Sequence, residues 1–247
     1  MALTDFAFLH GGGQGGWIWA ETIAALAAQS GRSVRTLVLD VPGCGTRRGR
    51  DTSLIEFDDI ATELVADIEA SGMRNVMLIG HSQAGMAMPR MVEFRPDLFA
   101  KLVYISCTAL PPGVRLMERM GVCLHGERDD QVGWPVDPKT STAPERARAM
   151  FCNDMSAGEA DAFVVKLGED AWPMSSYAYT DWRHDHLDGI PSTYVHCLQD
   201  AAMPPIWQER HAASLRVKRI TYIDAGHQVM NTRPQTLAEV LLAEAKR

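Results

Sequence analysis

The sequence predicts an α/β fold built on a mostly parallel, doubly wound sheet of about six strands. Short apolar runs recur along the chain at residues 6–9, 34–40, 76–80, 102–106, 193–198 and 219–224. Several of these runs are almost continuously apolar, as expected for parallel strands that are covered on both faces. Helical patterns lie between them, and an alternation of strand and helix is typical of this fold class.

Each predicted helix carries its own start and stop signals. Residues 19–31 are amphipathic and end at Gly31, a residue suited to a carboxyl-terminal cap. Residues 53–72 open with Ser53 and Glu56 in capping-box spacing, which predicts a helix start at Ser53. Further helices are predicted at residues 84–94, 204–215 and 234–247.

Residues 111–190 interrupt the alternation because they contain no clear strand. The segment is rich in proline, tryptophan and methionine, with helical stretches at residues 143–151 and 156–167. An insertion after the fourth predicted strand lies over the sheet edge where such folds bind ligands. We therefore predict one domain, with a core formed by residues 1–110 and 191–247 and a helical cap inserted at residues 111–190.

The composition describes an ordinary globular domain. The chain has 247 residues, 46% of them hydrophobic, and a net charge of −7, so neither nucleic acid nor an anionic membrane is an expected partner. The amino terminus lacks the pattern of a signal peptide, and no apolar run reaches the length of a membrane span. Five dispersed cysteines predict reduced thiols and a cytoplasmic location.

The glycine-rich loop FLHGGGQGGWIW, at residues 8–19, supports two different interpretations. Gly11, Gly13 and Gly16 satisfy the G-x-G-x-x-G pattern of dinucleotide-binding folds, and Asp40 follows the second strand where a ribose-binding acid belongs. This interpretation predicts an NAD-dependent dehydrogenase. Alternatively, a backbone N–H group of the loop stabilises an oxyanion, which predicts acyl transfer.

The sequence GHSQA, at residues 80–84, places Ser82 between a predicted strand and a predicted helix. This is the strand-turn-helix pattern of a nucleophile elbow, in which small residues on either side of the serine let strand and helix pass closely. Gly80 fits that requirement, whereas Ala84 stands where glycine is usual. Serine is a poor nucleophile without a base, so a histidine and an orienting acid are expected elsewhere.

Asp200 and His227 supply the two missing groups of a catalytic triad. Asp200 follows the fifth predicted strand, and His227 follows the sixth. The carboxyl ends of parallel strands meet at one edge of the sheet, so Ser82, Asp200 and His227 are expected to converge there. Their chain order, serine then acid then histidine, is the order of the α/β-hydrolases.

Five stretches carry a resemblance that covers nearly the whole chain and is weakest in the cap. The sequence resembles the α/β-hydrolases, and within them the plant methylesterase and hydroxynitrile lyase group with its bacterial esterase relatives. The stretches are FLHGGGQGGWIW, LDVPGCG, LIGHSQAGM, QDAAMPPIWQ and AGHQVM. The resemblance implies that the backbone N–H groups of Gly12 and Gln83 form an oxyanion hole. The lyases carry a lysine after the catalytic histidine; Gln228 at that position favours ester hydrolysis.

These observations predict a serine hydrolase that cleaves a carboxylic ester through an acyl-enzyme without a cofactor or a metal. Gly11, Gln14 and Trp134 are predicted to contact a small or medium-sized, apolar or aromatic substrate. Lactone, carbamate or carbon–carbon bond hydrolysis and hydroxynitrile cleavage remain alternatives. A dehydrogenase is disfavoured because Trp17 and Trp19 crowd the pyrophosphate position. A non-catalytic receptor is disfavoured by the complete triad, and the oligomeric state is open, with a homodimer as one option.

Overall fold

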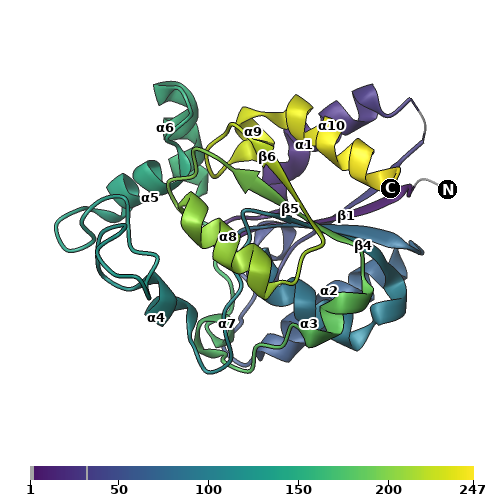
Figure 1. Cartoon of the computed structure of the whole chain (residues 1–247), viewed down its shortest axis with the longest axis horizontal. Coiled ribbons are helices and arrows are strands. Elements are labelled where there is room, and N and C mark those ends of the chain that lie inside the picture. The colour runs from purple at the N-terminus through teal and green to yellow at the C-terminus, as the bar shows by residue number, and fades with distance from the viewer. Residues whose placement is uncertain (1–2, 32) are drawn as a thin grey trace.

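The computed structural model describes residues 3–31 and 33–247 and contains a central parallel sheet (Figure 1). The strands hydrogen-bond in the order β2-β1-β3-β4-β5-β6, and every neighbouring pair is parallel. The predicted fold class is confirmed, and each predicted strand coincides with an observed one. The strands are β1 (Asp5–Leu9), β2 (Arg35–Leu39), β3 (Val76–His81), β4 (Phe99–Ile105), β5 (Ser192–Cys197) and β6 (Arg219–Ile223).

Helices cover both faces of the sheet because alternate residues of the strands point to opposite sides. In β1, Phe6 and Phe8 contribute to a core shared with α1 and α10, while Ala7 and Leu9 face a core shared with α2, α3 and α8. Figure 1 shows α1 and α10 on one side of the sheet and α2 and α3 on the other. These helices are α1 (Ala20–Gln29), α2 (Phe57–Ala70), α3 (Ala84–Phe94), α8 (Pro205–Ser214) and α10 (Pro234–Ala245).

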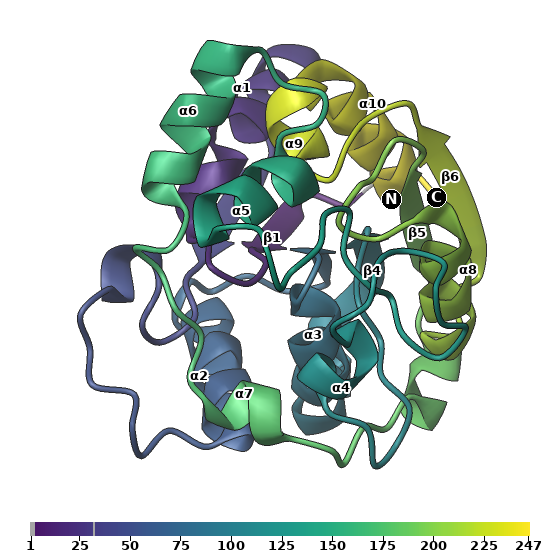
Figure 2. The ribbon, with the colours of Figure 1, turned by 90° about the vertical axis from the view of Figure 1, so that its left-hand side faces the viewer.

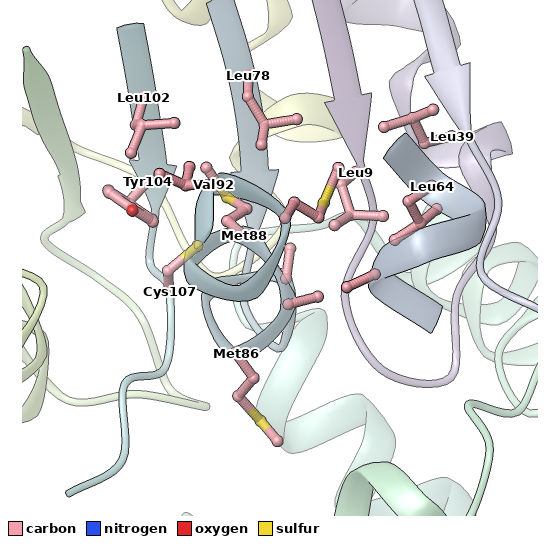
Figure 3. Close-up of a cluster of buried hydrophobic side chains, with 14 of the residues drawn as sticks. Leu9, Leu39, Leu64, Leu78, Met86, Met88, Val92, Leu102, Tyr104 and Cys107 are labelled. Carbon is pink, nitrogen blue, oxygen red and sulfur yellow. The ribbon is translucent and has the colours of Figure 1, made fainter. Parts of the chain in front are cut away.

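The larger core packs α2 and α3 tightly against the strands. Figure 3 shows Leu9 and Leu78 on neighbouring strands facing Met88 and Leu64 of the two helices. All four of these side chains have no solvent exposure. Burial of apolar surface of this kind stabilises a fold by roughly 25 cal/mol per Å², so this layer fixes the position of the turn that joins β3 to α3.

The start of α2 corrects one sequence prediction. The helix begins at Phe57, with Glu56 as its N-cap, whereas the capping-box spacing predicts a start at Ser53. The capping box is formed by Glu56 and Asp59 instead, and the Asp59 carboxylate accepts a hydrogen bond from the Glu56 N–H at 2.9 Å. Ser53 lies in the preceding turn, where its N–H donates to the Asp51 carboxylate at 2.9 Å.

A helical insertion follows β4, as predicted, and lies at the carboxyl ends of the strands. Figure 2, turned so that this side faces the viewer, shows its helices in front of the sheet. An isolated bridge between Leu124 and Trp134 is its one β-type pairing within the described residues. The insertion contains α4 (Leu116–Met120), α5 (Ala143–Phe151), α6 (Ala157–Lys166), α7 (Ser175–Ala178) and the 3-10 helix η4 (Asp185–Gly189).

The remaining elements are short. They are the 3-10 helices η1 (Gly16–Trp19), η2 (Gly45–Arg47) and η3 (Pro96–Leu98), and the helix α9 (Val229–Thr232). Among the helices of the described ranges, none has both the length and the apolar character needed to cross a membrane. The amino-terminal stretch that we interpret as lacking a signal peptide includes residues 1 and 2, which lie outside the described residues.

Candidate active site

Ser82 lies on the sharp turn between β3 and α3. Its backbone φ is +54°, in the left-handed region that residues with a side chain rarely adopt. The Ser82 N–H donates to the carbonyl of Ile105 at 3.1 Å, and the Ser82 carbonyl accepts from the N–H of Thr108 at 2.9 Å. These bonds from the end of β4 hold the strained turn in place. Ser82 lines a cavity of about 310 Å³ at this edge of the sheet.

Small residues around Ser82 are required by close backbone packing. A methyl group on Gly80 would collide with the sulfur of Met88 and lie 2.9 Å from the Cβ of Ala84. A methyl group on Gly85 would collide with the carbonyl oxygen of Thr108. Alanine is accommodated at position 84, so the departure from the usual glycine leaves the turn intact.

His227 and Asp200 form a buried hydrogen-bonded pair next to this turn. The Nδ1 of His227 lies 2.7 Å from the Oδ2 of Asp200, and both residues are at most 5% exposed. The other carboxylate oxygen, Oδ1, accepts the N–H groups of Ala202 and Met203, each at 2.8 Å. Because a carboxylate accepts hydrogen bonds, the pair places the proton on Nδ1 and leaves Nε2 with its lone pair.

Ser82 and His227 face the same cavity, but no hydrogen bond between described residues joins them. The Nε2 of His227 is buried and has no hydrogen-bond partner in the described part of the chain. In proteins without bound substrate, catalytic hydrogen bonds are often long or poorly aligned. The arrangement therefore places the unpaired nitrogen on a residue that lines the same cavity as the serine.

His81 packs against His227 from β3. The two ring centroids are 4.4 Å apart, and the Nε2 of His81 lies 3.0 Å from the backbone carbonyl of His227. Burial, followed by the nearby charge of His227, holds the pKa of His81 well below its usual range. His81 is therefore a neutral side chain that packs against His227.

Gly12 and Gln83 line the same cavity as Ser82. Gly12 belongs to the loop after β1, and Gln83 is the residue that precedes α3. Within residues 3–31 and 33–247, no backbone acceptor is bonded to either N–H. A methyl group on Gly12 would collide with the side-chain oxygen of Gln83, so a larger residue there would have to displace the end of that side chain.

The three residues predicted to contact substrate lie at different depths. Trp134 lines the cavity, and its Nε1–H donates to the carbonyl of Gly121 at 2.8 Å. Gly11 and Gln14 are buried and are not among the residues that line the cavity. The carbonyl of Gly11 accepts the Nε1–H of Trp172 at 3.0 Å. Neither residue therefore lies in the wall that faces the cavity.

The cavity walls are mainly apolar. The core contributes the loops that follow β1, β3, β4, β5 and β6, and the insertion contributes lining residues from α4, α5 and α7. Arg146 is the one permanently charged side chain among the described residues that line it. The apolar lining residues include Leu116, Met120, Trp134, Met150, Phe151 and Met203.

Asp40, the acid of the dinucleotide interpretation, is committed to local hydrogen bonds. One of its carboxylate oxygens accepts the N–H of Gly16 at 2.6 Å, and the other accepts the N–H and the hydroxyl of Thr46 at 2.9 and 2.8 Å. Trp19 is fully buried at the start of α1. These groups stabilise the loops and leave the helix start without the open anion site that a pyrophosphate requires.

Two groups near the pocket were not identified from the sequence. Ser106, at the end of β4, donates a hydrogen bond from its hydroxyl to the Oδ2 of Asp200. Tyr177 of α7 lines the cavity beside Gln83, and burial raises the pKa of its phenol. Ser106 follows a strand end, as Asp200 and His227 do, and that position is the sequence signal by which it could have been found. Tyr177 has no comparable signal.

His184 and His186 are two residues apart in the insertion, as a pair of metal ligands can be, but they have separate surroundings. The Nε2 of His186 lies 2.8 Å from the backbone carbonyl of Pro89, and burial lowers the pKa of His184 to about 4. In the described part of the chain, no group of three or more histidine, cysteine or acidic side chains is arranged to hold a metal ion.

Comparisons with known proteins show which family and fold the chain shares. Methylesterase 18 of Arabidopsis thaliana is 27% identical over 99% of this chain and 98% of its own length. Putative methylesterase 12, a chloroplastic protein of the same plant, is 33% identical over the whole chain and 73% of its length. The crystal structure of the Arabidopsis methylesterase MES16 has a TM-score of 0.74 at 19% identity and covers 99% of both chains.

The family comparison covers the core and the insertion together. Residues 6–240 match the alpha/beta hydrolase family, a span that includes Ser82, Asp200 and His227. The chain belongs to the alpha/beta hydrolase family.

Proposed function

We propose that the protein is a serine hydrolase that cleaves carboxylic esters through an acyl-enzyme at Ser82. One observation carries the proposal: a serine in left-handed backbone geometry shares a cavity with a buried His227–Asp200 pair. The names of the two methylesterase relatives support a carboxylic ester as the substrate class. The uncharged Gln228 after the histidine supports hydrolysis over cyanohydrin cleavage.

In the proposed mechanism, the Nε2 of His227 accepts the Ser82 proton while the serine oxygen attacks the ester carbonyl carbon. Asp200 fixes the imidazole tautomer and stabilises the imidazolium. The backbone N–H groups of Gly12 and Gln83 donate to the oxyanion, and each such donor is worth roughly 3–4 kcal/mol in related chemistry.

The tetrahedral intermediate then collapses, and the alcohol leaves with the proton held by His227. His227 next accepts a proton from a water molecule, whose oxygen attacks the acyl carbon. Collapse of the second intermediate returns the proton to Ser82 and releases the carboxylic acid. Every proton transfer uses the Nε2 of His227, the ring nitrogen that has no hydrogen-bond partner among the described residues.

The cavity supports a substrate with an apolar or aromatic group. Its volume of about 310 Å³ is at the small end of ligand pockets, and its walls are mostly methionine, leucine and aromatic side chains. Methionine side chains adapt to irregular apolar shapes, so a range of acyl groups fits such a wall. We infer a small or medium-sized ester.

We further propose a reducing compartment such as the cytoplasm. All five cysteines are free, and four of them are buried. Burial raises the pKa of the Cys107 and Cys197 thiols, which lowers their reactivity. Free structural thiols of this kind are typical of proteins that function among reductants.

The test of the proposed function is ester turnover by Ser82→Ala. The variant is expected to lose at least about 10³-fold in kcat against a panel of small aryl and methyl esters, because no nucleophile remains. Ser192→Ala, a buried serine on β5, is the matched control and is expected to retain activity. Activity of Ser82→Ala within tenfold of the wild type would contradict the mechanism.

A further inference from the structure

Ser106 stands out because its backbone is strained and its side chain contacts the acid of the candidate triad. Among the described residues, four non-glycine residues have positive φ, and two of them, Ser82 at +54° and Ser106 at +43°, belong to this site. We propose that Ser106 is a positioning residue that tunes the charge which Asp200 presents to His227. The inference rests on the proposed function of this site.

The contacts of Asp200 show what Ser106 adds. Its Oδ1 is saturated by two backbone N–H groups, and its Oδ2 accepts from both His227 Nδ1 and the Ser106 hydroxyl. Within the described ranges, Ser106 supplies the one hydroxyl bonded to this carboxylate, and it has no solvent exposure. The hydroxyl and the catalytic imidazole therefore share one oxygen atom.

The backbone around Ser106 explains why this contact is fixed. The Ser106 N–H donates to the carbonyl of Val195 at 3.1 Å, and two residues later Thr108 donates to the carbonyl of Ser82 at 2.9 Å. The turn thus connects the acid side of the site to the nucleophile side. Glycine adopts left-handed geometry without steric cost. A serine held there in its place indicates that the hydroxyl contributes something that offsets the strain.

The charged and titratable groups around His227 identify that contribution. Asp200 lies against Nδ1, neutral His81 packs on the ring from β3, and Asp154 binds the N–H of Gly226 at 2.8 Å beside it. Phe151 of α5 packs against the His227 ring, with the two ring centroids 5.4 Å apart. By donating to Oδ2, the Ser106 hydroxyl neutralises part of the carboxylate charge, so Asp200 holds a proton on His227 less strongly. The imidazole is then free to act as a base at lower pH.

The test follows the protonation of His227 directly by NMR. The ring signals of His227 are assigned by their loss in His227→Gln and are titrated in the wild type and in Ser106→Ala. The titration midpoint is expected to move to higher pH by about one unit, the size of one hydrogen bond to a charged group. On the acidic limb of the pH profile, where protonated His227 is the inactive form, kcat for an ester substrate is expected to fall about tenfold with KM changed less than twofold.

Two further variants separate the hydroxyl from the fold. Ser192→Ala removes a buried serine hydroxyl at the start of β5, the end of that strand far from Asp200. The His227 titration midpoint of this variant is expected to match that of the wild type. Ser106→Gly keeps the left-handed turn without strain and is expected to show the same shift as Ser106→Ala; it replaces that variant if alanine prevents folding. A midpoint that is unchanged, or that moves to lower pH, overturns the proposal.

The role of Ser106 and the proposed hydrolase activity are contradicted by different results. A wild-type protein that hydrolyses no ester and does not react with a fluorophosphonate contradicts the serine hydrolase. The His227 titration is read on the same sample, so the role of Ser106 is still decided by the direction of the midpoint.

Discussion

At the scale of single residues, the site depends on backbone conformations that few side chains tolerate. Ser82 and Ser106 both occupy left-handed geometry, and hydrogen bonds from neighbouring strands and turns hold them there. Strain of about 1–3 kcal/mol at each such residue is common at functional sites. The surrounding layer of buried leucine and methionine side chains stabilises the fold, and this stabilisation offsets the cost of the two strained residues.

Residue types at strand ends were the most informative part of the sequence. Ser82, Asp200 and His227 were predicted because each follows an apolar run, and the structure places them at one edge of the sheet. Ser106 follows such a run as well, but a serine has no distinctive spacing from its partner 94 residues away. Gln14 was predicted to contact substrate from its closeness in sequence to Gly12, yet it is buried and is not among the residues that line the cavity.

At the scale of elements, the junction of β3, α3 and the end of β4 determines the position of the nucleophile. A side chain on Gly85 would collide with the carbonyl oxygen of Thr108 and lie 2.7 Å from the Cβ of Cys107. Both obstacles are part of the short segment that follows β4. The backbone oxygen has no rotamer by which to move away, so the elements themselves would have to separate.

We therefore predict that Gly85→Ala destabilises the fold. The free energy of unfolding, measured by urea denaturation, is expected to fall by about 1–3 kcal/mol, the usual cost of overpacking a core. Gly158→Ala is the matched control, because Gly158 lies in α6 with open space around it, and it is expected to be neutral or stabilising. Equal stability of Gly85→Ala and the wild type would show that this junction is looser than described.

Helix boundaries show where local sequence signals compete. Ser53 and Glu56 match a capping box, but the Ser53 N–H is taken by Asp51 and the helix begins one turn later at Phe57. Two adjacent capping signals compete there, and burial of Phe57 in the core favours the second. In contrast, the α5 start was predicted correctly, because Thr142 and Glu145 form the capping box without a rival.

At the scale of the whole molecule, the fold was predictable because the strands are continuously apolar and the helices amphipathic. The shape of the cavity was not, because its far wall comes from an insertion whose prolines and short helices lack a period. Trp134 was the one residue of that wall selected from the sequence. Tyr177 and Met150 reach the cavity only through the path of the insertion between α4 and η4.

Buried histidines make the stability of the whole molecule sensitive to pH. Burial is the main cause that lowers the pKa of both His184 and His211 to about 4, from a usual value of 6.5. In the unfolded chain these side chains bind protons near pH 6.5, whereas in the folded chain they do not until about pH 4. Their contribution to stability is therefore complete above pH 6.5 and is lost as the pH falls towards 4.

The expected result is a fall in the free energy of unfolding of roughly 1–3 kcal/mol between pH 7 and pH 5, measured by urea denaturation. His211→Asn removes one of the two groups, so its stability is expected to vary less steeply with pH than that of the wild type. A wild-type free energy that stays constant over this interval, or an unchanged slope in the variant, would be inconsistent with a neutral buried histidine.

In the proposed mechanism, Ser82 is activated by His227 and is the one residue that forms a covalent bond to substrate. The most direct measurement is peptide mapping by mass spectrometry after reaction with a fluorophosphonate, in the wild type and in Ser82→Ala and His227→Gln. We predict a single label on the peptide that contains Ser82, none in Ser82→Ala, and labelling slowed by at least about 10³-fold in His227→Gln. A stoichiometric label on any other residue, or labelling of His227→Gln at the wild-type rate, would contradict the account.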